Sequence, residues 1–206
     1  MSLETWLAFV AASLILTVTP GPSILLGVVH SLNYGTRKTL FTALGDISAN
    51  MLQMLLVAVG LGIVIASSEL AFQVIKWAGV LTLIYMSLRL WRSEPRLEGL
   101  QTDTANAHPM RLFASGFLVA FGNPKALIFF TAFFPQFIDP SADLTGQLMV
   151  MCPTMAALDF TFVMLYALGA KRLLGFLRSH PKILNRLSGV ALMSAAGFMG
   201  TLARGG

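Results

Sequence analysis

The sequence predicts an all-α integral membrane protein of six transmembrane helices, arranged as two inverted three-helix repeats with breaks in helices one and four. Composition indicates the class, because 56% of the residues are hydrophobic and only 11% are charged. About a quarter of the residues of a soluble domain are charged. The repeats are indicated by two matched proline breaks and by sequence matches that keep their order in the two halves.

Six apolar stretches are long enough to cross a bilayer, since about 20 helical residues span about 30 Å of hydrocarbon. They cover residues 5–29, 39–66, 72–91, 110–134, 147–170 and 184–203. The polar stretch 93–109 is expected to be a cytoplasmic loop between a first repeat, 1–92, and a second, 110–206. Because three is an odd number, two such repeats in tandem face opposite ways across the membrane, as in many secondary transporters.

The first and fourth spans are interrupted where proline and glycine or asparagine make a poor helix interior. The interruptions comprise Thr19, Pro20, Gly21, Pro22 and Ser23 in one span and Asn123, Pro124 and Lys125 in the other. Each proline after the break can begin a half-helix, with Gly21 or Asn123 as its N-cap. Such a helix end carries unpaired N–H groups and a positive dipole, which suit a substrate carboxylate. The alternative is a proline kink tolerated by neighbouring helices.

The second span repeats in the fifth, and the third in the sixth. ALGDISANML at 43–52 aligns with AALDFTFVML at 156–165, which matches Asp46 with Asp159. KWAGV at 76–80 aligns with RLSGV at 186–190. Neither match is strong alone, but their order along the chain is kept.

Three ionisable residues, Asp46, Asp159 and Lys125, fall inside these spans. A charge there costs about 2.5 to 3.5 kcal/mol on insertion scales, so it normally faces a cavity or pairs with another charge. We expect each aspartate to exchange a proton or to bind an ammonium group. Polar residues recur at intervals of three and four around Asp46 and predict a cavity-lining face that includes Thr39, Thr42, Asn50 and Gln53. The alternative is a structural pair between Lys125 and either aspartate.

The basic residues follow the odd-numbered spans. They are Arg37 and Lys38, then Arg92, Arg96 and Arg111, then Lys171, Arg172, Arg178 and Lys182. The positive-inside rule makes these connections cytoplasmic and places both termini outside. The basic stretch 171–186 is expected to lie on the lipid surface. Since the basic residues do not share one soluble face, a nucleic-acid partner is not expected.

The remaining polar residues indicate no cofactor. The lone Cys152 can form no internal disulfide and offers no metal-site spacing. The three histidines fall near span ends or in the central loop, and we expect His30, His108 and His180 to be surface residues.

With these motifs in place, the sequence resembles the lysine exporter (LysE) superfamily, in its threonine and homoserine exporter (RhtB-type) branch. The resemblance rests on TPGPS at 19–23, ALGD at 43–46, KWAGV at 76–80, LRLWRS at 88–93, GNPKALIFFTAFFPQFI at 122–138 and LNRLSGVAL at 184–192. It implies an inner-membrane exporter of amino acids that exchanges its substrate for protons. It points to Pro20, Gly21, Pro22, Asp46, Asn123, Pro124 and Lys125 as functional positions. The chain departs from the family pattern at Thr82 and Ser87, where a tyrosine and a glycine are common, and this bears on substrate identity.

The sequence therefore predicts a secondary transporter, not an enzyme, that exports a small neutral amino acid or a derivative by proton antiport. Its partners are the substrate, protons and the lipid bilayer, and a homo-oligomer stays open. One alternative is a passive channel. The other is an intramembrane aspartic protease, which uses two close carboxyl groups but has a glycine where this chain has Ala43.

Overall fold

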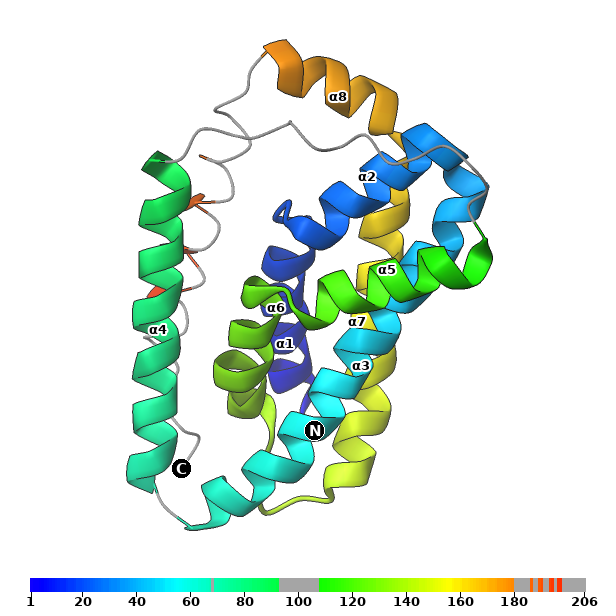
Figure 1. Ribbon diagram of the computed structural model, residues 1–206. Coiled ribbons are helices and arrows are strands. Elements are labelled where there is room, and N and C mark those ends of the chain that lie inside the picture. The colour runs from blue at the N-terminus through cyan, green and yellow to red at the C-terminus, as the bar shows by residue number, and fades with distance from the viewer. Residues whose placement is uncertain are drawn as a thin grey trace.

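A computed structural model describes residues 1–67, 69–92 and 108–179, together with residues 186, 189, 190, 193, 194, 196 and 197. Every regular element within these residues is a helix, which confirms the predicted class (Figure 1). Most of the predicted sixth span, 184–203, and most of the predicted loop at 93–109 lie outside the described residues. The six-span repeat therefore stays a prediction.

The first predicted break is present. Helix α1 (Leu3–Val18) ends before the prolines, and α2 (Pro22–Tyr34) begins at the second of them, bent by 53° from α1. A single residue, Gly35, joins α2 to α3 (Thr36–Ser67), and its φ of 84° explains why it is glycine. Helix α4 (Glu69–Arg92) follows.

The second predicted break is present as well. Helix α5 (Pro109–Phe121) and α6 (Pro124–Ile128) meet at a bend of 52°. Beyond α6 the chain continues as a π-helical turn, η1 (Phe129–Phe133), and a 3-10 turn, η2 (Phe134–Phe137). The straight helix α7 (Leu144–Leu168) leads into α8 (Ala170–Ser179), a helix within the predicted basic surface segment.

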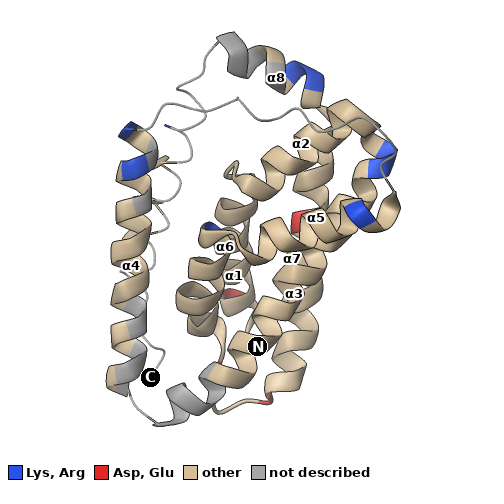
Figure 2. Cartoon of the chain, in the orientation of Figure 1, with Lys and Arg blue, Asp and Glu red and all other residues tan. Residues whose placement is uncertain are grey.

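Length and apolar composition fit a membrane protein. Two helices, α3 over Thr36–Gly60 and α7, are long and apolar enough to cross a bilayer, and each bent pair passes the same test as one broken span. Figure 2 shows lysine and arginine on α8, at the end of α4, at the start of α5 and near the junction of α2 and α3, at one end of the molecule. We call this the basic end.

Helices α3 and α5 approach each other closely at two glycines. A Cβ atom on Gly45 would lie 2.0 Å from the carbonyl oxygen of Phe113, and one on Gly116 would lie 2.1 Å from that of Thr42. Small residues at such a crossing let the two backbones come into contact. The joint holds in place the part of α3 that carries Asp46.

An aromatic cluster packs α1 against the segment that follows α6. Phe9 of α1 packs edge-on against Phe134 and Phe137 of η2, with ring centroids 6.2 and 5.6 Å apart. Phe130 and Phe133 are buried in the same cluster. These rings pack α1 against η1 and η2, the irregular segment that follows α6.

Candidate functional site

The two chain breaks meet in the interior. Gly21 and Asn123 are the N-caps of α2 and α6, as predicted, and each is followed by proline at the first helical position. The Asn123 amide donates to the Ser23 hydroxyl at 3.4 Å. A Cβ atom on Gly21 would lie 3.3 Å from both Cε and Nζ of Lys125, so the glycine leaves room for the lysine beside it.

The two half-helix starts differ in their backbone N–H groups. The Asn123 side chain accepts a hydrogen bond from the N–H of Lys125 at 3.1 Å, so α6 is capped from within. Gly21 has no side chain that could cap α2. The start of α2 is therefore the more open of the two to an anion.

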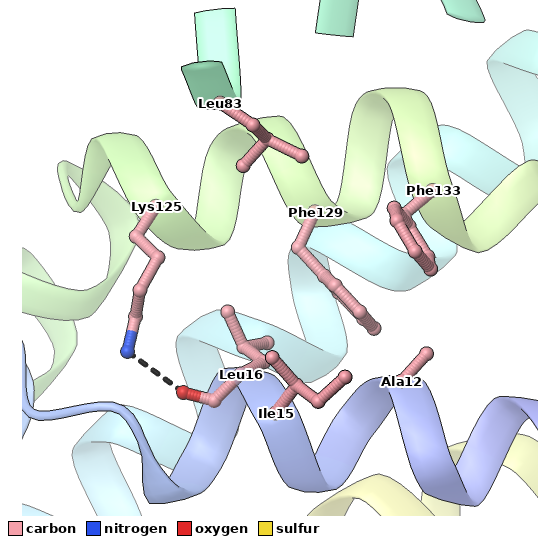
Figure 3. Close-up of a pocket in the computed structure, with 7 residues that line it drawn as sticks. All are labelled: Ala12, Ile15, Leu16, Leu83, Lys125, Phe129 and Phe133. Carbon is pink, nitrogen blue, oxygen red and sulfur yellow. Dashed lines mark hydrogen bonds between the residues drawn. The ribbon is translucent and has the colours of Figure 1, made fainter. Parts of the chain in front are cut away.

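Lys125 is 8% exposed and extends from α6 to the end of α1. Its Nζ donates to the backbone carbonyls of Leu16 at 2.7 Å and Thr19 at 2.5 Å, the first of which Figure 3 shows. Those carbonyls form the negative end of α1, where a cation is favourable. Among the described residues, the hydrogen-bond partners of this ammonium are carbonyls and not the carboxylate of either aspartate.

The two predicted aspartates come together from α3 and α7. Asn50, one turn beyond Asp46, donates through Nδ2 to Oδ2 of Asp159 and, at 3.5 Å, to Oδ2 of Asp46. Asp46 is 3% exposed and Asp159 is 8% exposed. Oδ1 of Asp46 and Oδ1 of Asn50 are buried without a hydrogen-bond partner among the described residues. Such buried acceptors are costly, so they are places for a proton, a water or a donor of the ligand.

The rest of the polar face of α3 is buried as well, but it contacts other groups. Thr42 lies with its hydroxyl 2.7 Å from Nδ1 of His30. The Gln53 amide donates to the carbonyl of Phe121, at the end of α5, at 2.8 Å. The expectation that His30 lies at the surface is wrong, because this residue is only 3% exposed. Helix α2 continues past the predicted span end at residue 29, to Tyr34, so His30 lies within the helix and not at its end.

A small cavity lies where these groups meet. Its volume is about 20 Å³, room for about one water molecule. Seven of the residues predicted for the site line it: Gly21, Ser23, Asp46, Asn50, Asn123, Lys125 and Asp159. The other predicted site residues, which do not belong to its lining, are Thr19, Pro20, Pro22, Thr42, Gln53 and Pro124. Sequence reasoning missed the further lining residues Leu16, Thr17, Ile24, Ala126 and Val163, most of which are apolar and give no chemical signal.

A second cavity of about 20 Å³ adjoins the first, sharing Leu16 and Lys125 with it. Figure 3 shows its apolar walls, with Phe129 and Phe133 extending from η1 toward Ile15 and Ala12 of α1, and Leu83 of α4 on the far side. The aliphatic part of Lys125 thus borders an apolar space while its ammonium faces the polar one. Within the described part of the chain, no group of three or more acidic, histidine or cysteine side chains could hold a metal ion.

Comparisons with known proteins found a matching family model and several relatives. The family model of the LysE type translocators matches residues 14–202. An uncharacterized membrane protein of Vibrio cholerae is 31% identical over 191 residues, which cover 91% of each chain. Homoserine/homoserine lactone efflux proteins of Salmonella typhimurium and Salmonella typhi are 31% and 30% identical over 195 residues, 94% of each chain. No solved structure matches the chain.

Proposed function

Because the chain belongs to the LysE type translocator family, we propose that it exports a small neutral amino acid, or a derivative of one, from the cytoplasm in exchange for protons. Relatives named for efflux of homoserine and homoserine lactone support this substrate class. Homoserine is therefore the first substrate to test. Membership of a translocator family favours transport over the protease alternative.

One observation carries the proposal: two buried carboxyl groups, Asp46 and Asp159, share a cavity with one buried ammonium, Lys125. If all three were ionised, the cavity would hold one uncompensated negative charge. An unpaired charge is expensive inside a bilayer. The acid pair therefore needs one more positive charge. A proton supplies it, and so does the ammonium group of a substrate whose carboxylate is held separately by the positive start of α2.

This competition between proton and ammonium is the basis of the proposed exchange. A substrate ammonium that enters beside Asn50 meets both aspartates and displaces their shared proton. When the substrate leaves, the pair takes up a proton again. A carrier that resets only with a proton or with a substrate on its acid pair is an antiporter.

The substrate carboxylate is placed at the start of α2. There the backbone N–H groups after Pro22 lack a side-chain cap, and the hydroxyl of Ser23 and the ammonium of Lys125 lie beside them. A zwitterion would thus lie with its carboxylate against α2 and its ammonium against α3 and α7. Because the cavity holds about one water, substrate entry requires the helices to separate, and the bends at the two chain breaks are the places where they can do so.

The basic end supports the proposed orientation of the protein in the membrane. By the positive-inside rule, the helix ends that carry Arg37, Lys38, Arg111, Lys171 and Arg172 face the cytoplasm. Helix α1 then begins outside, in keeping with an N-terminus on the outer side of the inner membrane. The C-terminus lies outside the described residues, and its placement on the same side rests on the six-span prediction.

The experiment is homoserine efflux from proteoliposomes, with and without an inward proton gradient. The wild-type protein should release homoserine in a gradient-dependent manner and take up protons as it does so. The variant Asp46→Asn should insert normally but lose the proton-dependent part of efflux by at least about tenfold, because the pair can no longer share a proton. The matched control is Asp143→Asn, at the exposed N-cap of α7. Because asparagine caps a helix as well as aspartate does, this variant should keep wild-type efflux.

Two results would count against the proposal. Unchanged efflux by Asp46→Asn would remove Asp46 from the mechanism. Homoserine release by the wild-type protein at a rate independent of the proton gradient would favour the passive channel instead.

A further inference from the structure

A buried histidine lies between the acid pair and the basic end. His30 belongs to the second half of α2, and its Nδ1 is 2.7 Å from the hydroxyl of Thr42 on α3. Its ring also packs edge-on against Tyr34, with centroids 5.5 Å apart. The proposed exchange described above uses neither His30 nor Thr42, so their buried polar contact needs a separate explanation.

Thr42 connects the histidine to the acid pair. It lies four residues before Asp46 on α3, so the two are about 6 Å apart along one helix face. One water molecule can bridge a separation of this size. Oδ1 of Asp46 is buried without a hydrogen-bond partner among the described residues, and so has an acceptor position left for such a water.

On the other side, the residues of α2 that directly follow His30 line an open cavity at the basic end, although His30 itself does not belong to the lining. Ser31, next to His30, has its hydroxyl 3.1 Å from that of Thr36. Both residues line a cavity of about 660 Å³, whose other walls come from α7 and α8 and include the exposed Lys171 and Arg172. His30 therefore lies between the closed site at the chain breaks and a space that leads to the cytoplasmic side.

We propose that His30 and Thr42 carry the proton released by Asp46 to the cytoplasmic end of the protein. The proposal rests on the proposed proton exchange. In the relay, the carboxyl of Asp46 gives its proton to the bridging water, and the water gives one of its own to the Thr42 hydroxyl. That hydroxyl passes its proton to Nδ1 of His30. The imidazole then loses the proton on Nε2 toward the basic end, which leaves the water and the threonine unchanged and the neutral ring protonated on Nδ1.

The surroundings of His30 suit a proton carrier. Its hydroxyl partner can both accept and donate a proton, which a carbonyl cannot do. The charged side chains on the described parts of the elements packed against α2 are Arg37, Lys38 and Asp46 of α3, Arg111 of α5, Asp159 of α7, and Lys171 and Arg172 of α8. All the basic ones are exposed, whereas both acidic ones are buried. The buried base Lys125 of α6 lies at the opposite end of α2, beside Gly21. Asp46, one turn from Thr42 on α3, is the buried charge that can stabilise a proton on the ring.

The test separates substrate movement from proton movement. Homoserine-for-homoserine exchange between equal pools requires no net proton flow, whereas efflux driven by a proton gradient does. The variants are His30→Gln, which keeps hydrogen bonding without proton transfer, Thr42→Val, which removes the hydroxyl, and Thr42→Ser, which restores it. Thr161→Val is the matched control, since its exposed hydroxyl bonds only the carbonyl of Ala157 on its own helix among the described residues.

His30→Gln and Thr42→Val should keep exchange within about twofold of wild type and lose gradient-driven efflux, with its proton uptake, by at least about tenfold. Thr42→Ser and Thr161→Val should keep both. If His30→Gln retains gradient-driven efflux, or if it loses exchange and gradient-driven efflux equally, the relay is wrong. If the wild-type protein itself shows no gradient-driven efflux, the proposed function fails and the relay fails with it.

Discussion

The close joint between α3 and α5 makes Gly45→Ala a sharp test of the structure. The new Cβ atom would lie 2.0 Å from the backbone oxygen of Phe113, whereas ordinary van der Waals contact begins at 3.4 Å. The difference, 3.4 Å less 2.0 Å, is a deficit of about 1.4 Å. The obstructing atom belongs to a helix backbone and cannot rotate away, so the two helices must move apart.

Overpacking a core by a methyl group typically costs about 1 to 3 kcal/mol and sometimes more. We expect Gly45→Ala at or above the upper end of this range, because its clash is with backbone. The matched control is Gly60→Ala on the same helix, where an added Cβ atom meets no described residue within 4 Å. There alanine should leave stability unchanged or raise it by up to about 1 kcal/mol through helix propensity.

The assay is SDS-induced unfolding of the purified protein in mixed micelles, followed by circular dichroism. Gly116→Ala should destabilise by a similar amount, since its Cβ atom would lie 2.1 Å from the carbonyl oxygen of Thr42. The double variant should cost less than the sum of the singles, because one separation relieves both clashes. If Gly45→Ala and Gly60→Ala unfold at the same SDS concentration, the described α3–α5 contact is wrong.

Two further predictions concern the chain breaks. Asn123→Ala removes the cap on the Lys125 N–H and should lower the unfolding free energy by about 1 kcal/mol. Asn123→Ser should recover most of this loss. Equal losses of stability in both variants would contradict the capping role. Gly21→Ala puts a methyl group 3.3 Å from Cε and Nζ of Lys125. Because the lysine side chain is flexible and can move, the variant should fold with nearly wild-type stability. It should bind homoserine at least about fivefold more weakly in exchange assays. Unchanged affinity would remove the start of α2 from the substrate site.

The breaks and the polar face of α3 could be predicted because their signals are local. Proline and glycine limit the backbone wherever they occur, so Pro22 and Pro124 mark helix starts without any knowledge of the fold. The interval of three and four residues around Asp46 places Asn50 on the same face for the same reason. In each case the sequence alone contains the physical cause.

The partners of these residues could not be predicted, because they depend on how the helices pack. Lys125 bonds the carbonyls of Leu16 and Thr19, and backbone carbonyls are alike at every position of a sequence. The burial of His30 was missed because hydropathy falls after residue 29, whereas α2 continues until Gly35, where φ becomes positive and the chain turns. The end of that helix is set by a backbone conformation and not by hydropathy.

The difference between the two breaks gives the site its charge. The proposed repeat matches Pro22 with Pro124, and therefore Ser23 with Lys125, at the residue after each proline. A symmetric chain would have either two lysines, which would neutralise both Asp46 and Asp159, or none. With serine at one break and lysine at the other, the cavity has one base for two acids. That single unmatched carboxylate is the charge for which a proton and a substrate ammonium compete, so the asymmetry between the halves is what would couple one to the other.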